Sequence, residues 1–221
     1  MKIGIIGAMK IEINLILERM KTYEIIEKSG FIFYVGEKIV LTSCSVGKVN
    51  AAACTQVLID NFEVSAVINT GIAGGIATNI EIGDIVLSTS CTYHDVRPEQ
   101  MRHFFPYQEE FTSDENLIKL AQKSFETLTT NANLHLGKVI TGDSFISDTE
   151  LKRQLIAEYS PACVEMEGAA IAHVAYINQV PFLIIRAISD KADAQASVNY
   201  EEFEEKAAHL SADLVWEMVK K

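Results

Sequence analysis

The chain has 221 residues, a hydrophobic content of 48% and a formal net charge of -11 at pH 7. That length and hydrophobic content suffice for one large core, so we expect one domain over residues 1–221. Because the protein is acidic and has no cluster of Lys or Arg, its charge argues against nucleic acid and anionic membranes as partners. The first apolar run is shorter than a signal peptide requires, and no segment reaches the ~20 apolar residues of a membrane span, which predicts a cytoplasmic protein.

Apolar runs of strand length alternate with segments of helical periodicity along most of the chain. Strands are predicted at residues 2–7, 38–44, 66–71, 84–90, 137–142, 162–166 and 181–189. Helices are predicted at residues 11–20, 48–62, 115–128, 149–159 and 168–178, and from about residue 200 toward the C-terminal end. This alternation predicts an α/β fold in which helices cover both faces of the sheet.

One long span, from Tyr93 to Ser113, shows neither periodicity and is rich in aromatic residues. Long loops of this kind often close over a binding pocket, so the span is a candidate lid. Exposed Phe and Tyr side chains also mark subunit contacts, and this alternative stays open.

Acidic residues follow two of the predicted strands. Glu12 lies in the first turn of the helix after the strand at 2–7, and Asp190 follows the strand at 181–189. Ligands of α/β proteins bind beyond the carboxyl ends of strands, and a carboxylate there is costly unless it is used or paired. Each acid also has a structural explanation, since Asp190 suits a helix N-cap and Glu12 suits the positive end of a helix dipole.

Glu165 and Glu167 bracket Met166 where an apolar strand meets a helix of small residues. Two residues apart, their side chains share a face of an extended chain and diverge on a helix. We therefore expect at least one of them to face the pocket, while the other serves the start of the helix.

The glycine-rich segments match no nucleotide-binding fingerprint. Gly4 and Gly7 lack the third glycine of the dinucleotide motif, and the GKV segment at 47–49 lacks the Ser or Thr of a P-loop. The TGIAGG segment at 70–75, which includes Gly74, would let backbone N–H groups approach a phosphate or a ribose. Such glycines also serve backbone geometry alone, as at a strand-to-helix turn.

Nine short segments stand in an order and at spacings shared with one enzyme family. They read IGIIGAMKIE, SVGKVNAA, INTGIAGG, GDIV, YHD, GDSFI, VEMEGAAIAH, VPFLIIRAISD and YEEF, and they run nearly end to end. In these segments the chain resembles the 5′-methylthioadenosine/S-adenosylhomocysteine nucleosidases. The resemblance implies a nucleoside phosphorylase-like three-layer α/β fold with a mixed sheet, a homodimer, and hydrolysis of an adenosyl N-glycosidic bond without a cofactor or a metal.

Breaking a ribose-to-purine bond builds positive charge on the sugar and negative charge on the base. Such an enzyme needs an acid at the purine, a carboxylate near the sugar and an activated water. By family likeness, Asp190 donates a proton to the imidazole side of adenine, Glu12 activates the water and Glu167 holds the ribose hydroxyls. The first role requires that burial raise the pKa of Asp190.

The resemblance also implies which residues bind the substrate. Phe145 would stack on adenine, and the backbone of Ile146 would read the edge of the base. Further implied residues pack along the sugar (Met166), support Asp190 and the water (Ser189, Arg186), line the slot for the 5′-thio group (Met9, Val46) and close over the base (Tyr200). For the last three, ordinary core packing is an alternative explanation.

Two features depart from the family pattern. Ile72 stands where many family members carry a serine, which implies that a polar contact is lost or replaced. The span 96–111 differs from the family's usual sequence and carries added positive charge. Its apolar residues, Met101, Phe104, Phe105 and Tyr107, still suit a slot for the 5′ substituent, reached across a dimer interface. A substrate with a carboxylate, such as S-adenosylhomocysteine, or a different purine nucleoside therefore stays open.

Two other functions also stay open on the sequence. A phosphorolytic purine nucleoside phosphorylase of the same fold would use phosphate in place of water, but it would need converging cations, and Glu12 would repel the phosphate. A non-catalytic nucleoside-binding protein would keep the pocket and release no adenine.

Overall fold

The computed structural model describes residues 2–220 and places β5 at the centre of a mixed sheet. The strands are β1 (Lys2–Gly7), β2 (Glu24–Lys28), β3 (Phe31–Val35), β4 (Ile39–Ser43), β5 (Val64–Gly75), β6 (Ile85–Tyr93), β7 (Phe111–Thr112), β8 (Leu134–Thr141), β9 (Cys163–Glu165) and β10 (Phe182–Asp190). The helices are α1 (Lys10–Arg19), α2 (Lys48–Phe62), α3 (Pro98–His103), α4 (Glu115–Phe125), α5 (Thr149–Tyr159), α6 (Gly168–Ile177) and α7 (Ala196–Val219).

β5 has three neighbours, which is why it organises the sheet. It runs parallel to β1 and β10 and antiparallel to the short β9. β6 pairs with β10 and β8, and β8 pairs with β9, so that β5, β10, β6, β8 and β9 form a closed ring of strands. On the other side of β5, the sheet continues through β1, β4, β3 and β2. The predicted α/β fold with a mixed sheet is confirmed.

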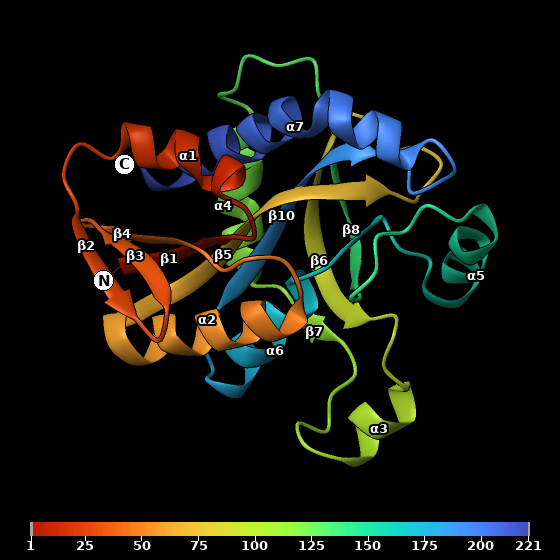
Figure 1. Ribbon diagram of the computed structural model, residues 1–221, viewed down its shortest axis with the longest axis horizontal. Coiled ribbons are helices and arrows are strands. Elements are labelled where there is room, and N and C mark those ends of the chain that lie inside the picture. Colours follow the sequence, from red (N-terminus) through yellow and green to blue (C-terminus); the bar gives the residue numbers. More distant parts are fainter. Residues whose placement is uncertain (1, 221) are drawn as a thin grey trace.

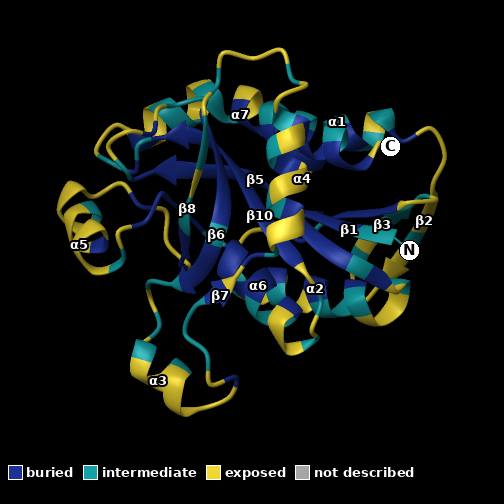
Figure 2. Ribbon diagram, turned by 180° about the vertical axis from the view of Figure 1, so that it is seen from behind, coloured by how far each residue is buried: buried dark blue, intermediate teal, exposed yellow. Residues whose placement is uncertain are grey.

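Helices cover both faces of the sheet, as Figure 1 shows. α2 and α6 pack together on one face over a core that includes Leu58 and Ile171. α1 and α4 pack against α7 on the other face, over a core that includes Ile16 and Val215. β10 is buried along its whole length between these layers, which explains its nearly continuous apolar sequence. Figure 2 shows the buried strands between helices whose outer sides are exposed.

Several element predictions need correction. The β2–β3 hairpin was not predicted, because β2 is an exposed edge strand that lacks a buried apolar side. β5 continues beyond the predicted strand end at residue 71 and includes Gly74 and Gly75, and the span 93–113 contains α3 and β7. The last helix begins at Ala196 rather than near residue 200. Within residues 2–220, no helix combines the length and the apolarity needed to cross a membrane.

Candidate active site

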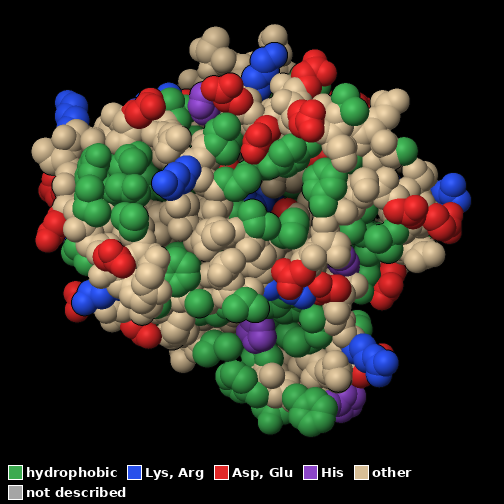
Figure 3. All heavy atoms as spheres, in the orientation of Figure 1, with side chains coloured by type: hydrophobic (Ala, Val, Ile, Leu, Met, Phe, Trp, Pro, Cys, Tyr) green, Lys and Arg blue, Asp and Glu red, His purple; other side chains and the backbone are tan. Residues whose placement is uncertain are grey.

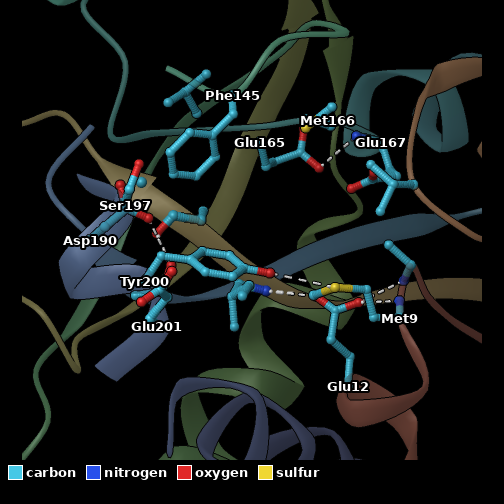
Figure 4. A pocket seen from close by; sticks show the side chains of 17 residues that line it. Met9, Glu12, Phe145, Glu165, Met166, Glu167, Asp190, Ser197, Tyr200 and Glu201 are labelled. Carbon is cyan, nitrogen blue, oxygen red and sulfur yellow. Dashed lines mark hydrogen bonds between the residues drawn. The ribbon is translucent and has the colours of Figure 1, made fainter. Parts of the chain in front are cut away.

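A cavity of about 400 Å³ opens where β1, β5, β9 and β10 end, and the first turns of α7 complete its wall. Figure 3 shows a hollow on this face of the molecule, bordered by hydrophobic side chains. Its acidic lining residues are Glu12, Glu165, Glu167, Asp190 and Glu201 (Figure 4). Three acids with expected catalytic or ribose-binding roles, Glu12, Glu167 and Asp190, therefore face one cavity.

Glu12 is buried at the start of α1 and is held by backbone N–H groups that follow β1 and by one within β5. Its Oε2 accepts hydrogen bonds from Ala8 N (2.7 Å) and Met9 N (2.9 Å), and its Oε1 accepts one from Ile72 N (3.0 Å). Burial raises the pKa of Glu12, while the charge of Arg186 and these hydrogen bonds act in the opposite direction. The carboxylate of Glu12 thus binds backbone N–H groups at the N-terminus of α1, and it also borders the cavity.

Arg186 lies in the middle of β10, fully buried, and does not line the cavity. Its Nη2 atom pairs with Oε2 of Glu165 and lies 3.7 Å from Oε2 of Glu167. A Cβ atom at position 71 would lie 2.2 Å from Nη1 of Arg186 and 2.4 Å from Oε1 of Glu12, so this approach requires Gly71. One buried cation therefore offsets the charge of three neighbouring glutamates, which in turn raise the pKa of Arg186.

Glu165 and Glu167 have separate roles. Glu165 accepts hydrogen bonds from the hydroxyl of Thr141 and from the backbone N–H of Glu167 (3.0 Å), besides its pair with Arg186. These bonds fix the start of α6, so Glu165 is structural although it borders the cavity. Glu167 accepts one hydrogen bond, from Gly47 N over 2.8 Å. Its pKa is raised to about 7, first by burial and then by the charge of Glu165.

Asp190 ends β10 at the far side of the cavity from Glu167 (Figure 4). Its Oδ1 accepts a hydrogen bond from Ala192 N and its Oδ2 accepts one from the hydroxyl of Ser189, both over 2.8 Å. Burial raises the pKa of Asp190 against these two hydrogen bonds. A Cβ atom at position 74 would lie 2.9 Å from Oδ1 of Asp190, so the carboxyl group of Asp190 can occupy this position because residue 74 is glycine.

Two aromatic side chains border the same end of the cavity. The rings of Phe145 and Tyr200 lie 5.7 Å apart between centroids, at an angle of 87°. Phe145 is 46% exposed, so part of its ring is uncovered, and Figure 4 shows it above Tyr200 in that view. The hydroxyl of Tyr200 lies 3.5 Å from the sulfur of Met9 and donates to Glu204 over 2.9 Å. A planar heterocycle near Asp190 would find an aromatic face on which to stack.

The cavity gathers most of the predicted site residues. Besides the three acids it is lined by Met9, Val46, Gly74, Phe145, Met166, Ser189 and Tyr200. Ile146 borders a smaller adjoining cavity of about 30 Å³ instead. Ser197 and Glu201 line the main cavity and were not predicted. Tyr200 and Glu201 follow Ser197 by three and four residues, a spacing that places all three on one helix face, and this spacing could have predicted that Ser197 and Glu201 line the cavity together with Tyr200.

Residues 96–111, which we call the arm, do not close over this cavity. None of them lines it, and α3 projects away from the sheet in Figure 1. The side chains of Phe104, Phe105 and Tyr107 are 69%, 67% and 68% exposed. Within one chain the arm therefore does not cover the cavity, because the strands that carry it direct it outward. The alternative that this span makes a subunit contact stays open.

Comparisons with known proteins agree with this geometry. The family model described as the phosphorylase superfamily matches residues 2–220. A 5′-methylthioadenosine/S-adenosylhomocysteine nucleosidase of Exiguobacterium is 36% identical, over 100% of this chain and 98% of the relative. The crystal structure of such a nucleosidase from Colwellia psychrerythraea, in complex with adenine, is 36% identical with a TM-score of 0.94, over 99% of this chain and 94% of that one. A futalosine hydrolase of Helicobacter pylori is 33% identical with a TM-score of 0.90, over 98% and 96% of the two chains.

Proposed function

Because the chain belongs to the phosphorylase superfamily, and within it to the 5′-methylthioadenosine/S-adenosylhomocysteine nucleosidases, we propose that it hydrolyses the N-glycosidic bond of these two nucleosides. The products are adenine and a ribose that keeps its 5-substituent. The observation that carries the proposal is that Glu12, Glu167 and Asp190, far apart in the sequence, line one cavity. A glycosidic bond held between them would have an acid on one side and a base on the other.

Asp190 is the general acid in this proposal. Its raised pKa favours the protonated form, and the hydroxyl of Ser189 holds the carboxyl in place. As the bond between C1′ and the purine breaks, the base gains electron density and takes the proton of Asp190. The uncovered part of the Phe145 ring would stack on the same base.

Glu12 is the general base that takes a proton from the attacking water. Its Oε1 accepts one hydrogen bond from Ile72 N and has a second lone pair for the water. Burial raises the pKa of Glu12, and the neighbouring charge of Arg186 opposes this shift and so favours the ionised form that a base requires. Because the backbone of Ile72 makes this contact, the isoleucine side chain at that position does not remove it.

Glu167 holds the ribose hydroxyls and stabilises the positive charge that develops on the sugar. One hydrogen bond from Gly47 leaves several acceptor sites of its carboxylate free. Met166, which also lines the cavity, would pack against the sugar ring. The substrate thus runs from Asp190 at the base to Glu167 at the ribose.

Water, and not phosphate, is the nucleophile in this proposal. Five acidic side chains line the cavity, and its lining includes no Lys or Arg among the described residues. A phosphate dianion would be repelled there, since phosphate sites use converging cations. The test is to incubate 5′-methylthioadenosine with the protein, with and without phosphate. If adenine and a free 5-substituted ribose form at the same rate with and without phosphate, the result supports hydrolysis. A requirement for phosphate would indicate a phosphorylase. Tight nucleoside binding without release of adenine would indicate a binding protein.

We also propose that the protein is a cytoplasmic homodimer in which the arm contacts the second copy. The exposed aromatic side chains of Phe104, Phe105 and Tyr107 form an apolar surface of the kind that interfaces bury. A second copy would cover them, and through this contact the arm would approach the other subunit's 5′ slot.

A further inference from the structure

A second cavity of about 490 Å³ adjoins the first one. The two share Ala8, Met9 and Val46, so the side chains of Met9 and Val46 form the wall between them. The second cavity continues over β3 and the loop that precedes α2. It has no part in the reaction described above.

The two cavities differ sharply in charge. Five acids line the first, whereas Lys10 is the one charged residue among the described residues that line the second. Lys10 is exposed and forms no ion pair within residues 2–220. In a chain with a net charge of -11, a cavity with a free ammonium group and no carboxylate is suited to an anionic group.

The shared wall lies at the ribose end of the first cavity. Figure 4 shows Met9 on the opposite side from Asp190 and on the same side as Glu167. Val46 directly precedes Gly47, whose N–H group binds Glu167. A nucleoside with its base at Asp190 and its ribose hydroxyls at Glu167 therefore has its 5′ end near the wall.

We propose that the second cavity binds the 5′ substituent of an adenosine whose substituent is a flexible apolar chain that ends in a carboxylate, and that Lys10 pairs with this carboxylate. Phe31 and Ile32 supply apolar wall for the chain, and the polar groups of Ser43 and Asn50 lie along its course. The proposal rests on the proposed function, because it takes the orientation of the nucleoside from it. It adds to the proposed function a place for the end of the 5′ substituent and a residue, Lys10, that would favour a substituent with a carboxylate over an uncharged one.

Two adenosines of equal tail length test the proposal, one with a 5′-(3-carboxypropylthio) group and one with a 5′-butylthio group. The readout is the ratio of their kcat/KM values. Because Lys10 is exposed, we expect Lys10→Glu to lower this ratio about five- to tenfold, and high salt to reduce the effect. Lys10→Arg should keep the ratio of the wild type. Lys21→Glu, an exposed lysine beyond the other end of α1, is the matched control and should also keep it.

Three results would overturn the proposal. The ratio could stay within twofold of the wild type in Lys10→Glu, which would place the tail elsewhere. Both compounds could lose turnover equally, which would make Lys10 structural. Lys10→Glu could change the dissociation of a dimer and leave the ratio intact, which would assign the cavity to a second copy of the chain. If the wild type releases adenine from neither compound, the proposed function fails; the ratio of the two dissociation constants, measured by calorimetry, then tests the cavity by itself.

Discussion

The hydroxyl of Ser189 donates a hydrogen bond of 2.8 Å to Oδ2 of Asp190, and this carboxyl forms no ion pair within the described residues. Glu12 differs, because the charge of Arg186 opposes the effect of burial on its pKa. Burial raises the pKa of both acids, but a nearby arginine favours ionisation of Glu12 alone. The pKa of both acids is therefore raised, and they differ in the buried arginine that lies beside Glu12. The proposed mechanism assigns proton donation to Asp190 and proton acceptance to Glu12 on two sides of the bond.

Asp190→Asn is expected to lower the rate of adenine release about a thousandfold, because an amide has no acidic proton to give to the base. The asparagine can keep the hydrogen bond from Ala192, so thermal unfolding should change little. Steady-state adenine release and circular dichroism melting measure the two effects. Asp193→Asn, three residues away and outside the cavity lining, is the control. Turnover near that of the wild type in Asp190→Asn would remove the acid role.

Glu12→Gln is expected to lower kcat by about a hundredfold or more and to change the dissociation constant of a nucleoside analogue by less than about threefold. The glutamine oxygen can still accept backbone hydrogen bonds at the helix start, whereas it cannot take a proton from water. Single-turnover kinetics and calorimetry separate the two quantities. Glu18→Gln on the exposed side of α1 serves as control. An equal loss of turnover and binding would show that Glu12 is only structural.

Glu167→Gln is expected to weaken nucleoside binding and to stabilise the ligand-free protein at pH 8. The pKa of Glu167 in the folded state is about 7, above the value of about 4.3 expected for an unfolded chain. The folded state therefore binds the proton more tightly, and this group makes the free energy of unfolding fall as pH rises from about 4.3 to 7. Glutamine removes that loss, so we expect a gain of about 1 to 3 kcal/mol at pH 8.

Urea unfolding at pH 4.5 and pH 8 checks this prediction. The difference between the variant and the wild type should be larger at pH 8 than at pH 4.5. Exposed Glu126→Gln is the control and should show no such dependence. Parallel behaviour of Glu167→Gln and the wild type at both pH values would contradict the raised pKa.

Arg186→Met is expected to lower the free energy of unfolding by about 3 to 5 kcal/mol, because it leaves the buried carboxylate of Glu165 without its cation. Adding Glu165→Gln to this variant should recover part of the loss, since the uncompensated charge is then removed. Urea denaturation of the wild type and the two variants measures both effects. A loss below about 1 kcal/mol in Arg186→Met would show that the pair is not a main source of stability.

Replacing both Phe104 and Phe105 by Ser is expected to weaken the proposed homodimer at least tenfold, because these exposed rings would be buried by the second copy. Sedimentation equilibrium gives the dissociation constant. Ile25→Ser removes another exposed apolar side chain, 63% exposed on the edge strand β2, and should leave the dimer unchanged. A wild-type protein that is monomeric at micromolar concentration would contradict the dimer itself.

Much of the fold and several site residues could be predicted from the sequence. The apolar run of β10 indicates a buried strand, and the periodic segment of α2 indicates a helix. The predicted bounds of both elements agree with the structure to within one residue. The family resemblance carried by nine segments is confirmed by the family model and by relatives of full length. The positions of Glu12 and Asp190 at strand ends pointed to one edge of the sheet, where both lie.

The sequence by itself therefore determined the α/β class, the family and the acids at the strand ends, because these depend on local periodicity and short motifs. Only the tertiary structure decided that Glu165 pairs with Arg186 while Glu167 faces the cavity, that the arm points away from it, and that Lys10 borders a second cavity. These relationships join residues from different strands and loops. They follow from the order in which β5, β9 and β10 pair, and that order is set by the packing of the whole chain rather than by any one segment.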